Sequence, residues 1–180
     1  HIREVDAIVH VVRCFEDENV VHVDGSVDPA RDIDTIQTEL ILADIETVSR
    51  RREKAAHLVR NGEKKFQDEL ECADILLSHM NEGKPARTAA LSKELLEVAE
   101  GWFLLTMKKV VYAANIAEGD VGKPESELPL VQKVRRIAEA EGSEVLVICA
   151  RAEEEIAQLD PEDKQMFLED MGLEKSGLDR

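Results

Sequence analysis

Two short apolar runs separated by one amphipathic stretch restrict the fold of this chain more than any other feature. The first run covers residues 110–114, follows Lys108-Lys109 and stops at Asn115, and the second covers residues 145–150. Between them, apolar residues recur three to four positions apart, which predicts a helix that Gly142 ends: Leu130, Val131, Val134, Ile137 and Ala138. Strand, helix and strand at this spacing predict two parallel strands joined by a crossover helix. We therefore expect an α/β fold with a parallel sheet.

The first run ends in Asn115 to Glu118, and the following Gly119-Asp120 predicts a turn. Ligands of open α/β sheets bind just beyond the carboxyl ends of the strands, so a site is expected at this turn. On these residues alone the alternative stays open that Asn115 only ends a strand.

Another apolar run, at residues 7–15, predicts a further strand, and its nearly continuous apolar character is typical of strands covered on both faces. Residues 20–23 predict a weaker extended segment. The sheet would then have about three strands, which is few for a complete doubly wound sheet. Since the chain also starts with His1 instead of Met, we expect a piece of a longer protein whose other strands precede His1.

The segment between the outer strands has a helical pattern. Asp28 and Pro29 predict a helix start, with Asp as the N-cap. Asn61-Gly62 interrupts two series of residues spaced four and three apart: Ile41, Ile45, Val48, Arg52, Ala55 and Val59, then Phe66, Leu70, Ala73, Leu77 and Met80. Two narrow seams around a break predict an antiparallel helical hairpin of coiled-coil type, too thin to be a globular core and suited to an arm.

A further helix is predicted over residues 88–105, with residues 102–105 packing the base of the arm onto the main body. Residues 153–159 and 161–171 predict terminal helices.

The charge and aromatic content restrict the partners. A formal net charge of -16 argues against a generic nucleic-acid or anionic-membrane surface, and 3% aromatic residues argue against a base-stacking platform. A local basic run, Arg50-Arg51-Arg52 with Lys54, could contact RNA phosphates, although charges on an exposed helix are usually a solvated face.

Cys14, Cys72 and Cys149 are odd in number and far apart, so the sequence predicts neither a disulfide framework nor a zinc site. With no signal peptide and no apolar run of membrane-spanning length, we expect a cytoplasmic protein with reduced thiols and no membrane contact. His10 lies within the first apolar run and is expected to be a hydrogen-bonded core histidine.

Several short motifs follow one another in a characteristic order over essentially the whole chain. They are residues 2–8 leading into 11–15, 28–33, 38–40, 42–44, 105–106, 115–118, 143–145, 149–150, 155–157 with Leu159, and the ending 171–173 with 177–180. In this order and spacing the chain resembles the Obg-like ATPases of the YchF subfamily, which are related to P-loop GTPases. The resemblance implies a P-loop nucleotide-binding domain interrupted by a helical coiled-coil arm and followed by a TGS domain.

On this resemblance, residues 1–27 and 102–180 are two parts of the nucleotide-binding domain, and residues 28–101 are the arm. The phosphate-binding motif G-x-x-x-x-G-K-[ST] does not occur in these 180 residues, and the Mg²⁺-linked D-x-x-G switch of the family is also absent. In the family both precede the position of His1. We therefore expect no catalytic residue and no Mg²⁺ ligand in this chain, and no ATP hydrolysis by the chain alone.

The resemblance implies that Asn115, Ile116, Ala117 and Glu118 form the base-recognition loop, which reads Asn-Lys-x-Asp in ordinary GTPases. An Asp carboxylate there accepts the N1 and N2 protons of guanine, whereas adenine presents an acceptor at N1. With Glu118 and Ile116 in place of Asp and Lys, the resemblance implies ATP bound in preference to GTP. The Ile116 carbonyl would accept from the adenine amino group, Asn115 would tie the loop to its neighbours, and the backbone of Cys149, Ala150 and Arg151 would close the other side of the base.

Two classes of function remain open. The chain is either a portion of an ATPase that forms ADP and phosphate and acts with the ribosome, or a non-catalytic module whose arm docks on the ribosome, on RNA or on a protein partner.

Overall fold

The computed structural model describes residues 7–16 and 27–157 of the chain. The predicted segment at residues 20–23 and the predicted helix at residues 161–171 lie outside them. The chain divides into two compact units. We call the residues up to Ile8 together with Asp34–Lys109 the arm unit, and Val9–Ile33 with the chain from Val110 onward the sheet unit. The domain limits drawn from the resemblance, at residues 28 and 101, stay a prediction.

The sheet has three strands in the order β1 (Ala7–Arg13), β2 (Lys109–Asn115) and β3 (Glu144–Ile148). β2 and β3 are parallel, with pairs running from Val111 and Glu144 to Asn115 and Ile148. The Cys14 amide donates to the Asn115 carbonyl at 2.8 Å, so β1 also has its carboxyl end at this edge. The prediction of a parallel sheet is confirmed.

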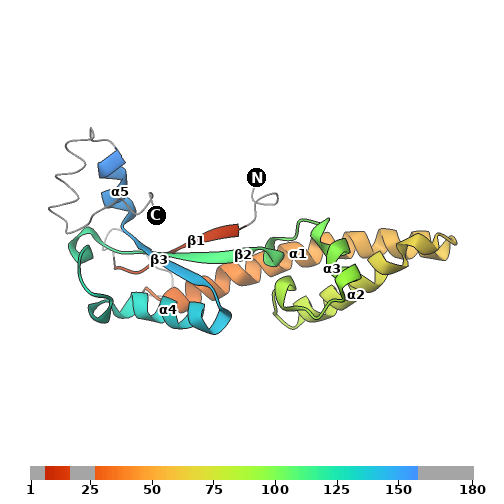
Figure 1. Ribbon diagram of the computed structural model, residues 1–180, viewed down its shortest axis with the longest axis horizontal. Coiled ribbons are helices and arrows are strands. Elements are labelled where there is room, and N and C mark those ends of the chain that lie inside the picture. The colour runs from red at the N-terminus through yellow and green to blue at the C-terminus, as the bar shows by residue number, and fades with distance from the viewer. Residues whose placement is uncertain (1–6, 17–26, 158–180) are drawn as a thin grey trace. The chain divides into compact units, whose positions relative to one another are not determined.

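The crossover helix α4 (Pro129–Glu141) joins β2 to β3 and lies along one face of the sheet (Figure 1). The core of the sheet unit forms between that face and α4, from buried residues that include Val12, Tyr112, Ala114, Val131, Val134 and Ala138. Gly142 ends α4 with φ 74°, a left-handed conformation that favours glycine, as the sequence predicts.

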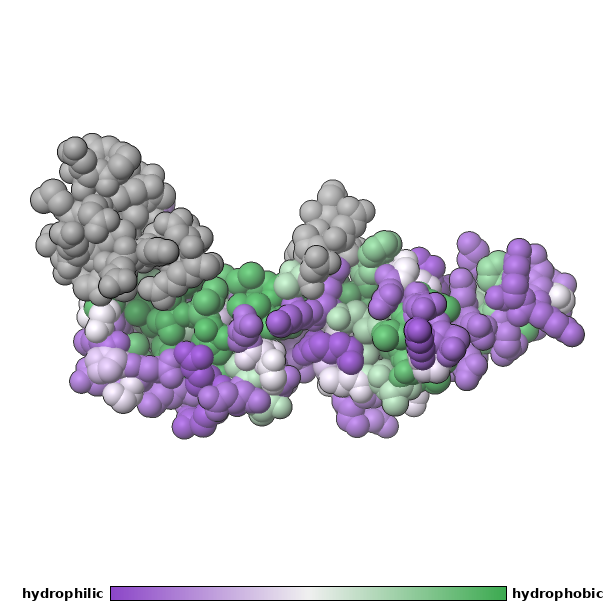
Figure 2. Space-filling view, in the orientation of Figure 1, coloured by the Kyte–Doolittle hydropathy of each residue, from purple (hydrophilic) through white to green (hydrophobic). Residues whose placement is uncertain are grey.

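The expectation that β1 is covered on both faces is wrong for the described residues. Val9 and Val11 are 59% and 56% exposed, whereas Val12 is buried. β1 lies at the edge of the three-stranded sheet, and α4 covers only the opposite face. Figure 2 shows hydrophobic residues at the surface over the strands.

In the arm unit, α1 (Pro29–Arg60) and α2 (Gln67–Asn81) run in opposite directions, joined by a turn in which Gly62 has φ 87° (Figure 1). The Asp28 side chain accepts from the amides of Ala30 and Arg31, which confirms it as the N-cap of α1. The remaining helices are α3 (Lys93–Glu100), α5 (Ala150–Ala157) and the short 3-10 turns η2 (Lys64–Phe66), η3 (Ala86–Thr88), η4 (Leu105–Met107), η5 (Glu118–Asp120) and η6 (Glu125–Glu127).

Two helix predictions differ from the structure. α3 spans eight residues, not 88–105, because the Ser92 hydroxyl caps its start and Phe103, with φ 52°, lies just beyond its end. α5 begins at Ala150, three residues before the predicted start.

The buried face of α2 also differs in part from the predicted seam. Ala73 and Met80 are buried as predicted, but Cys72 and Leu76 complete the face, and Leu77 is only partly buried. The buried face of α2 is wider than a two-helix seam because α2 packs on α3 as well as on α1.

The arm unit has its own core, contrary to the expectation that the hairpin is too thin for one. The cluster joins residues of α1, α2 and α3 with Trp102 and Leu104: Ile41, Val48, Cys72, Ala73, Leu76, Met80, Ala86, Leu95, Ala99, Trp102 and Leu104. Trp102, predicted to pack on the main body, belongs to this cluster.

Candidate functional site

The two loops that the sequence predicts to face a base lie together at the carboxyl edge of the sheet. The Asn115 side chain ends β2, and its Oδ1 accepts from the Ala150 amide at 2.8 Å. The Ile116 amide donates to the Ile148 carbonyl, also at 2.8 Å. β2 and β3 are parallel neighbours, so their following loops leave the sheet at the same edge.

The side chain of Asn115 has a structural role that explains its position. Ala150 is the first residue of α5, and the first amides of a helix have no partner within the helix. Asn115 satisfies one of them from the neighbouring strand. The side chain therefore fixes the start of α5 to the end of β2.

Ile116 and Ala117 contribute backbone to the site. The Ile116 side chain is only 6% exposed and lies in the core of the sheet unit. The Ala117 carbonyl accepts from the Asp120 amide at 3.0 Å, whereas no backbone amide among the described residues donates to the Ile116 carbonyl. That the Ile116 carbonyl accepts from a ligand stays a prediction.

Glu118 turns its carboxylate toward Arg151. Its Oε1 lies 3.5 Å from the Arg151 Nε, and the two side chains are 38% and 80% exposed. The same oxygen is buried and makes no hydrogen bond with the described residues. The contact is therefore an ion pair without hydrogen-bond geometry. The family resemblance implies a role only for the backbone of Arg151. An acid and a base that follow adjacent parallel strands are the signal in the sequence that indicates this side-chain pair.

Cys149 directly follows β3 and is buried in the core of the sheet unit, and Cys14 and Cys72 are also buried. None of the three forms a disulfide. Burial, with the nearby Asp32 carboxylate, raises the pKa of the Cys14 thiol to about 12. A thiol with so high a pKa is a poor nucleophile near neutral pH. These cysteines behave as small apolar residues of the core.

His10 is half-buried against Tyr112, with ring centroids 5.7 Å apart. Burial lowers the pKa of His10, while the carboxylates of Asp32 and Glu141 oppose this effect. The ring belongs to the packing of the sheet.

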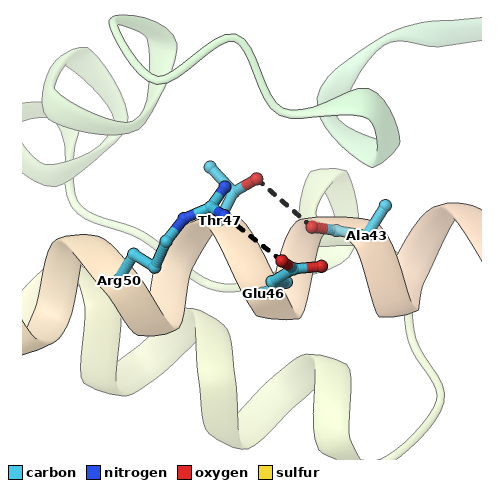
Figure 3. A network of polar contacts seen from close by, with 4 residues as sticks. All are labelled: Ala43, Glu46, Thr47 and Arg50. Carbon is cyan, nitrogen blue, oxygen red and sulfur yellow. Dashed lines mark hydrogen bonds and ion pairs between the residues drawn. The ribbon is translucent and has the colours of Figure 1, made fainter.

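The basic run of α1 has partners within the arm unit. Arg50 pairs with Glu46 one turn earlier at 3.2 Å, beside the Thr47 hydroxyl that donates to the Ala43 carbonyl (Figure 3). The Arg51 guanidinium lies 5.4 Å from the Trp102 ring. Arg52 pairs with Asp74 of α2. Of the three arginines, Arg52 links α1 to α2, Arg51 lies over Trp102, and Arg50 pairs within α1. RNA contact by this run stays a prediction.

Among the described residues, no three His, Cys, Asp or Glu side chains are grouped so that they could hold a metal ion. The Mg²⁺ inferred from the resemblance therefore stays a prediction about parts outside this chain. Within residues 7–16 and 27–157, no helix is long and apolar enough to cross a bilayer.

Comparison with known proteins gives matches over the whole chain, although no protein-family model matches it. The ribosome-binding ATPase YchF of Bacillus subtilis strain 168 is 45% identical over 180 residues, which is 100% of this chain and 49% of that protein. The protein of the same name from Escherichia coli O157:H7 is 39% identical over 100% of this chain and 48% of its own length. The structure of the Schizosaccharomyces pombe YchF GTPase superposes with a TM-score of 0.78 at 29% identity, over 98% of this chain and 48% of that one.

The fold and the site define an α/β protein with a parallel sheet, long helices and a candidate site beyond the carboxyl ends of two adjacent strands. The chain is a homologue of the YchF ribosome-binding ATPases, which confirms the resemblance seen in its motifs. It spans about half the length of the curated relatives that it matches.

Proposed function

We propose that this chain is the adenine-recognising portion of an Obg-like ATPase that forms ADP and phosphate and acts with the ribosome in the cytoplasm. The observation that supports it is the hydrogen bond from the Ala150 amide to the Asn115 side chain. This bond holds the two loops expected to enclose the base at one edge of a partial P-loop NTPase sheet.

The chemistry of the loop favours adenine over guanine. The Ile116 carbonyl is an acceptor suited to the adenine amino group. The Glu118 carboxylate, which would be the acceptor for the two guanine N–H groups, is paired with Arg151 instead. A carboxylate whose charge is offset by an arginine is a weaker acceptor for the guanine donors, and a site that satisfies those donors poorly discriminates against guanine. The relatives carry both names, ATPase and GTPase, so the preference needs direct measurement.

Phosphate binding and hydrolysis belong, in this proposal, to the intact protein with a P-loop and Mg²⁺ outside these residues. The 180 residues contain no G-x-x-x-x-G-K-[ST] motif, whose amides and Lys hold the phosphates. No chemical step is therefore assigned to a residue of this chain.

The arm supports a second function, docking on the ribosome through RNA or protein, which does not exclude the first. The relatives are named ribosome-binding ATPases. The arm unit has its own buried core, so it can present a defined surface to a large partner.

The base-recognition proposal is tested by the variant Asn115→Ala in the 180-residue chain. We expect the unaltered chain to bind ATP more tightly than GTP, and the variant to lose about tenfold in ATP affinity because the Ala150 amide loses its acceptor. Titrations followed by ligand-observed NMR measure such weak affinities, and saturation transfer to adenine H2 and H8 reports contact with the base.

Gln132→Ala is the matched control, since it removes a side-chain amide from α4 in the same unit. We expect it to leave the ATP affinity unchanged. GTP bound as tightly as ATP by the unaltered chain, or no transfer to the adenine protons, would contradict the proposal.

A further inference from the structure

We propose that the Arg151 side chain is a specificity-determining residue: it neutralises the Glu118 carboxylate and so makes the base loop tolerant of adenine. This inference rests on the proposed function, because it concerns which base the same loops accept. It adds a side-chain role where the motif resemblance offers only backbone.

The geometry of the two loops supports this role. Glu118 follows β2, Arg151 follows β3, and their charged atoms are 3.5 Å apart. A hydrogen bond of 2.8 Å from the Ala150 amide to the Asn115 Oδ1 joins the same two loops. Arg151 directly follows Ala150, so its backbone is held where its side chain reaches Glu118.

The state of the carboxylate oxygen is the second observation. Oε1 of Glu118 is buried and makes no hydrogen bond with the described residues. A carboxylate with an unused acceptor favours a ligand that brings N–H donors, and guanine brings two on one edge. The positive charge of Arg151 lies 3.5 Å from that oxygen and offsets the negative charge of the carboxylate.

The same charge removes a repulsion from adenine. Adenine presents a lone pair at N1, and an unpaired carboxylate facing it is unfavourable, whereas a neutralised one is not. The Arg151 side chain is 80% exposed, and pairs whose cation lies in solvent contribute little to folding stability. A role of Arg151 in specificity can therefore be distinguished from a role in stability. Loss of its charge should change the base preference and leave the unfolding midpoint unchanged.

The variant Arg151→Met removes the charge and keeps an unbranched apolar chain in place of the aliphatic stem. We expect the ratio of ATP to GTP affinity to fall by about fivefold or more, the size of one good polar contact to a base edge. The ratio is measured by NMR titration of the 180-residue chain with each nucleotide, and thermal unfolding of the variant should be unchanged.

Lys123→Met is the matched control. Lys123 forms an exposed ion pair with Asp120 at 2.9 Å, in the same loop region after β2 but without a link to α5. Its loss should leave the affinity ratio as it was. In a Glu118→Gln background, Arg151→Met should have no effect on the ratio, because there is no charge left to neutralise.

The outcomes separate this inference from the proposed function. An unaltered chain that does not prefer ATP contradicts the proposed function and this inference with it. An unaltered chain that prefers ATP, with Arg151→Met behaving as Lys123→Met does, contradicts this inference alone. An equal effect of Arg151→Met with and without Glu118→Gln also contradicts it, since Arg151 would then act on the nucleotide directly.

Discussion

At the scale of single residues, the buried Asp44 of α1 is the polar group on which the arm unit depends most. Its side chain is 0% exposed. Its two oxygens accept from the Leu105 amide, the Thr106 amide and the Thr106 hydroxyl at 2.6–2.8 Å. The Thr106 hydroxyl in turn accepts from the Ala86 amide at 2.8 Å. One carboxylate thus ties α1 to the segments that follow α2 and α3.

Asp44→Ala should destabilise the arm unit by about 3–5 kcal/mol, because it leaves buried donors of Leu105 and Thr106 without a partner. Trp102, the single tryptophan of the chain, lies in the same core, so urea unfolding followed by its fluorescence reports on this unit.

Asp74→Ala is the comparison, because it removes a carboxylate from an exposed ion pair with Arg52 and should cost within about 1 kcal/mol. Asp44→Asn, which keeps one acceptor oxygen, should fall between the two. Equal unfolding midpoints for Asp44→Ala and Asp74→Ala would show that the Asp44 hydrogen bonds are not what hold the segments together.

At the scale of elements, α2 is the centre of the arm unit, since it packs on α3 and on α1 through one continuous buried face. Cys72 lies on that face, and its thiol donates to the Leu95 carbonyl of α3 at 3.5 Å. Burial, assisted by the Glu69 and Glu71 carboxylates, raises the pKa of the Cys72 thiol from 9.0 to about 11. The helix contact therefore favours the neutral thiol.

This shift predicts a loss of stability at high pH. The folded chain keeps the Cys72 proton up to about pH 11, whereas the unfolded chain releases it near pH 9. The thiol contribution is thus fully present below pH 9 and is lost as the pH rises through 11, with a slope of at most about 1.4 kcal/mol per pH unit. The Trp102 urea titration at pH 8 to 11 measures it.

The variant Cys72→Ala lacks the thiol and therefore its pH-dependent contribution to the free energy of unfolding, while all other titrating groups are kept. The difference in unfolding free energy between the unaltered chain and Cys72→Ala should therefore narrow between pH 9 and 11. A constant difference across that range would mean that the Cys72 thiol has the same pKa folded and unfolded.

At the scale of the whole molecule, the division into an arm unit and a sheet unit predicts that partner docking and base recognition can be separated by mutation. The core of the arm unit reaches from Ile41 to Leu104, so removing the entire hairpin would expose Leu95 and Trp102. A shorter change is required. The Arg52–Asp74 ion pair shows that α1 and α2 lie side by side at these residues, so the chain can be rejoined beyond them.

Deleting residues 54–70 and joining the helices with about four glycines, a usual length for a helical hairpin loop, shortens the arm and keeps most of its core. We expect the shortened chain to lose co-sedimentation with Bacillus subtilis ribosomes and to keep its ATP affinity. A control with glycines at residues 61–63 keeps the hairpin length and should still co-sediment. Unchanged co-sedimentation of the shortened chain would contradict docking through the distal arm.

How far the sequence could predict this protein depended on the range of the interactions. Strand, helix and turn signals are local, so the N-cap at Asp28, the helix end at Gly142 and the parallel pair around α4 were all foreseen. The length of α3 was not, because Ser92 caps a helix that the apolar pattern alone extends too far. The motif order was enough to identify the family resemblance.

Local patterns in the sequence were sufficient to predict the strands, most of the helices, their order and the residues of the two loops at the ends of β2 and β3. Only the tertiary structure decided which side chains meet across those elements. The links Asn115–Ala150, Glu118–Arg151 and Asp44–Thr106 join residues at least 33 positions apart. Such contacts leave no trace in local periodicity, because they form only once the chain has folded and has brought distant segments together.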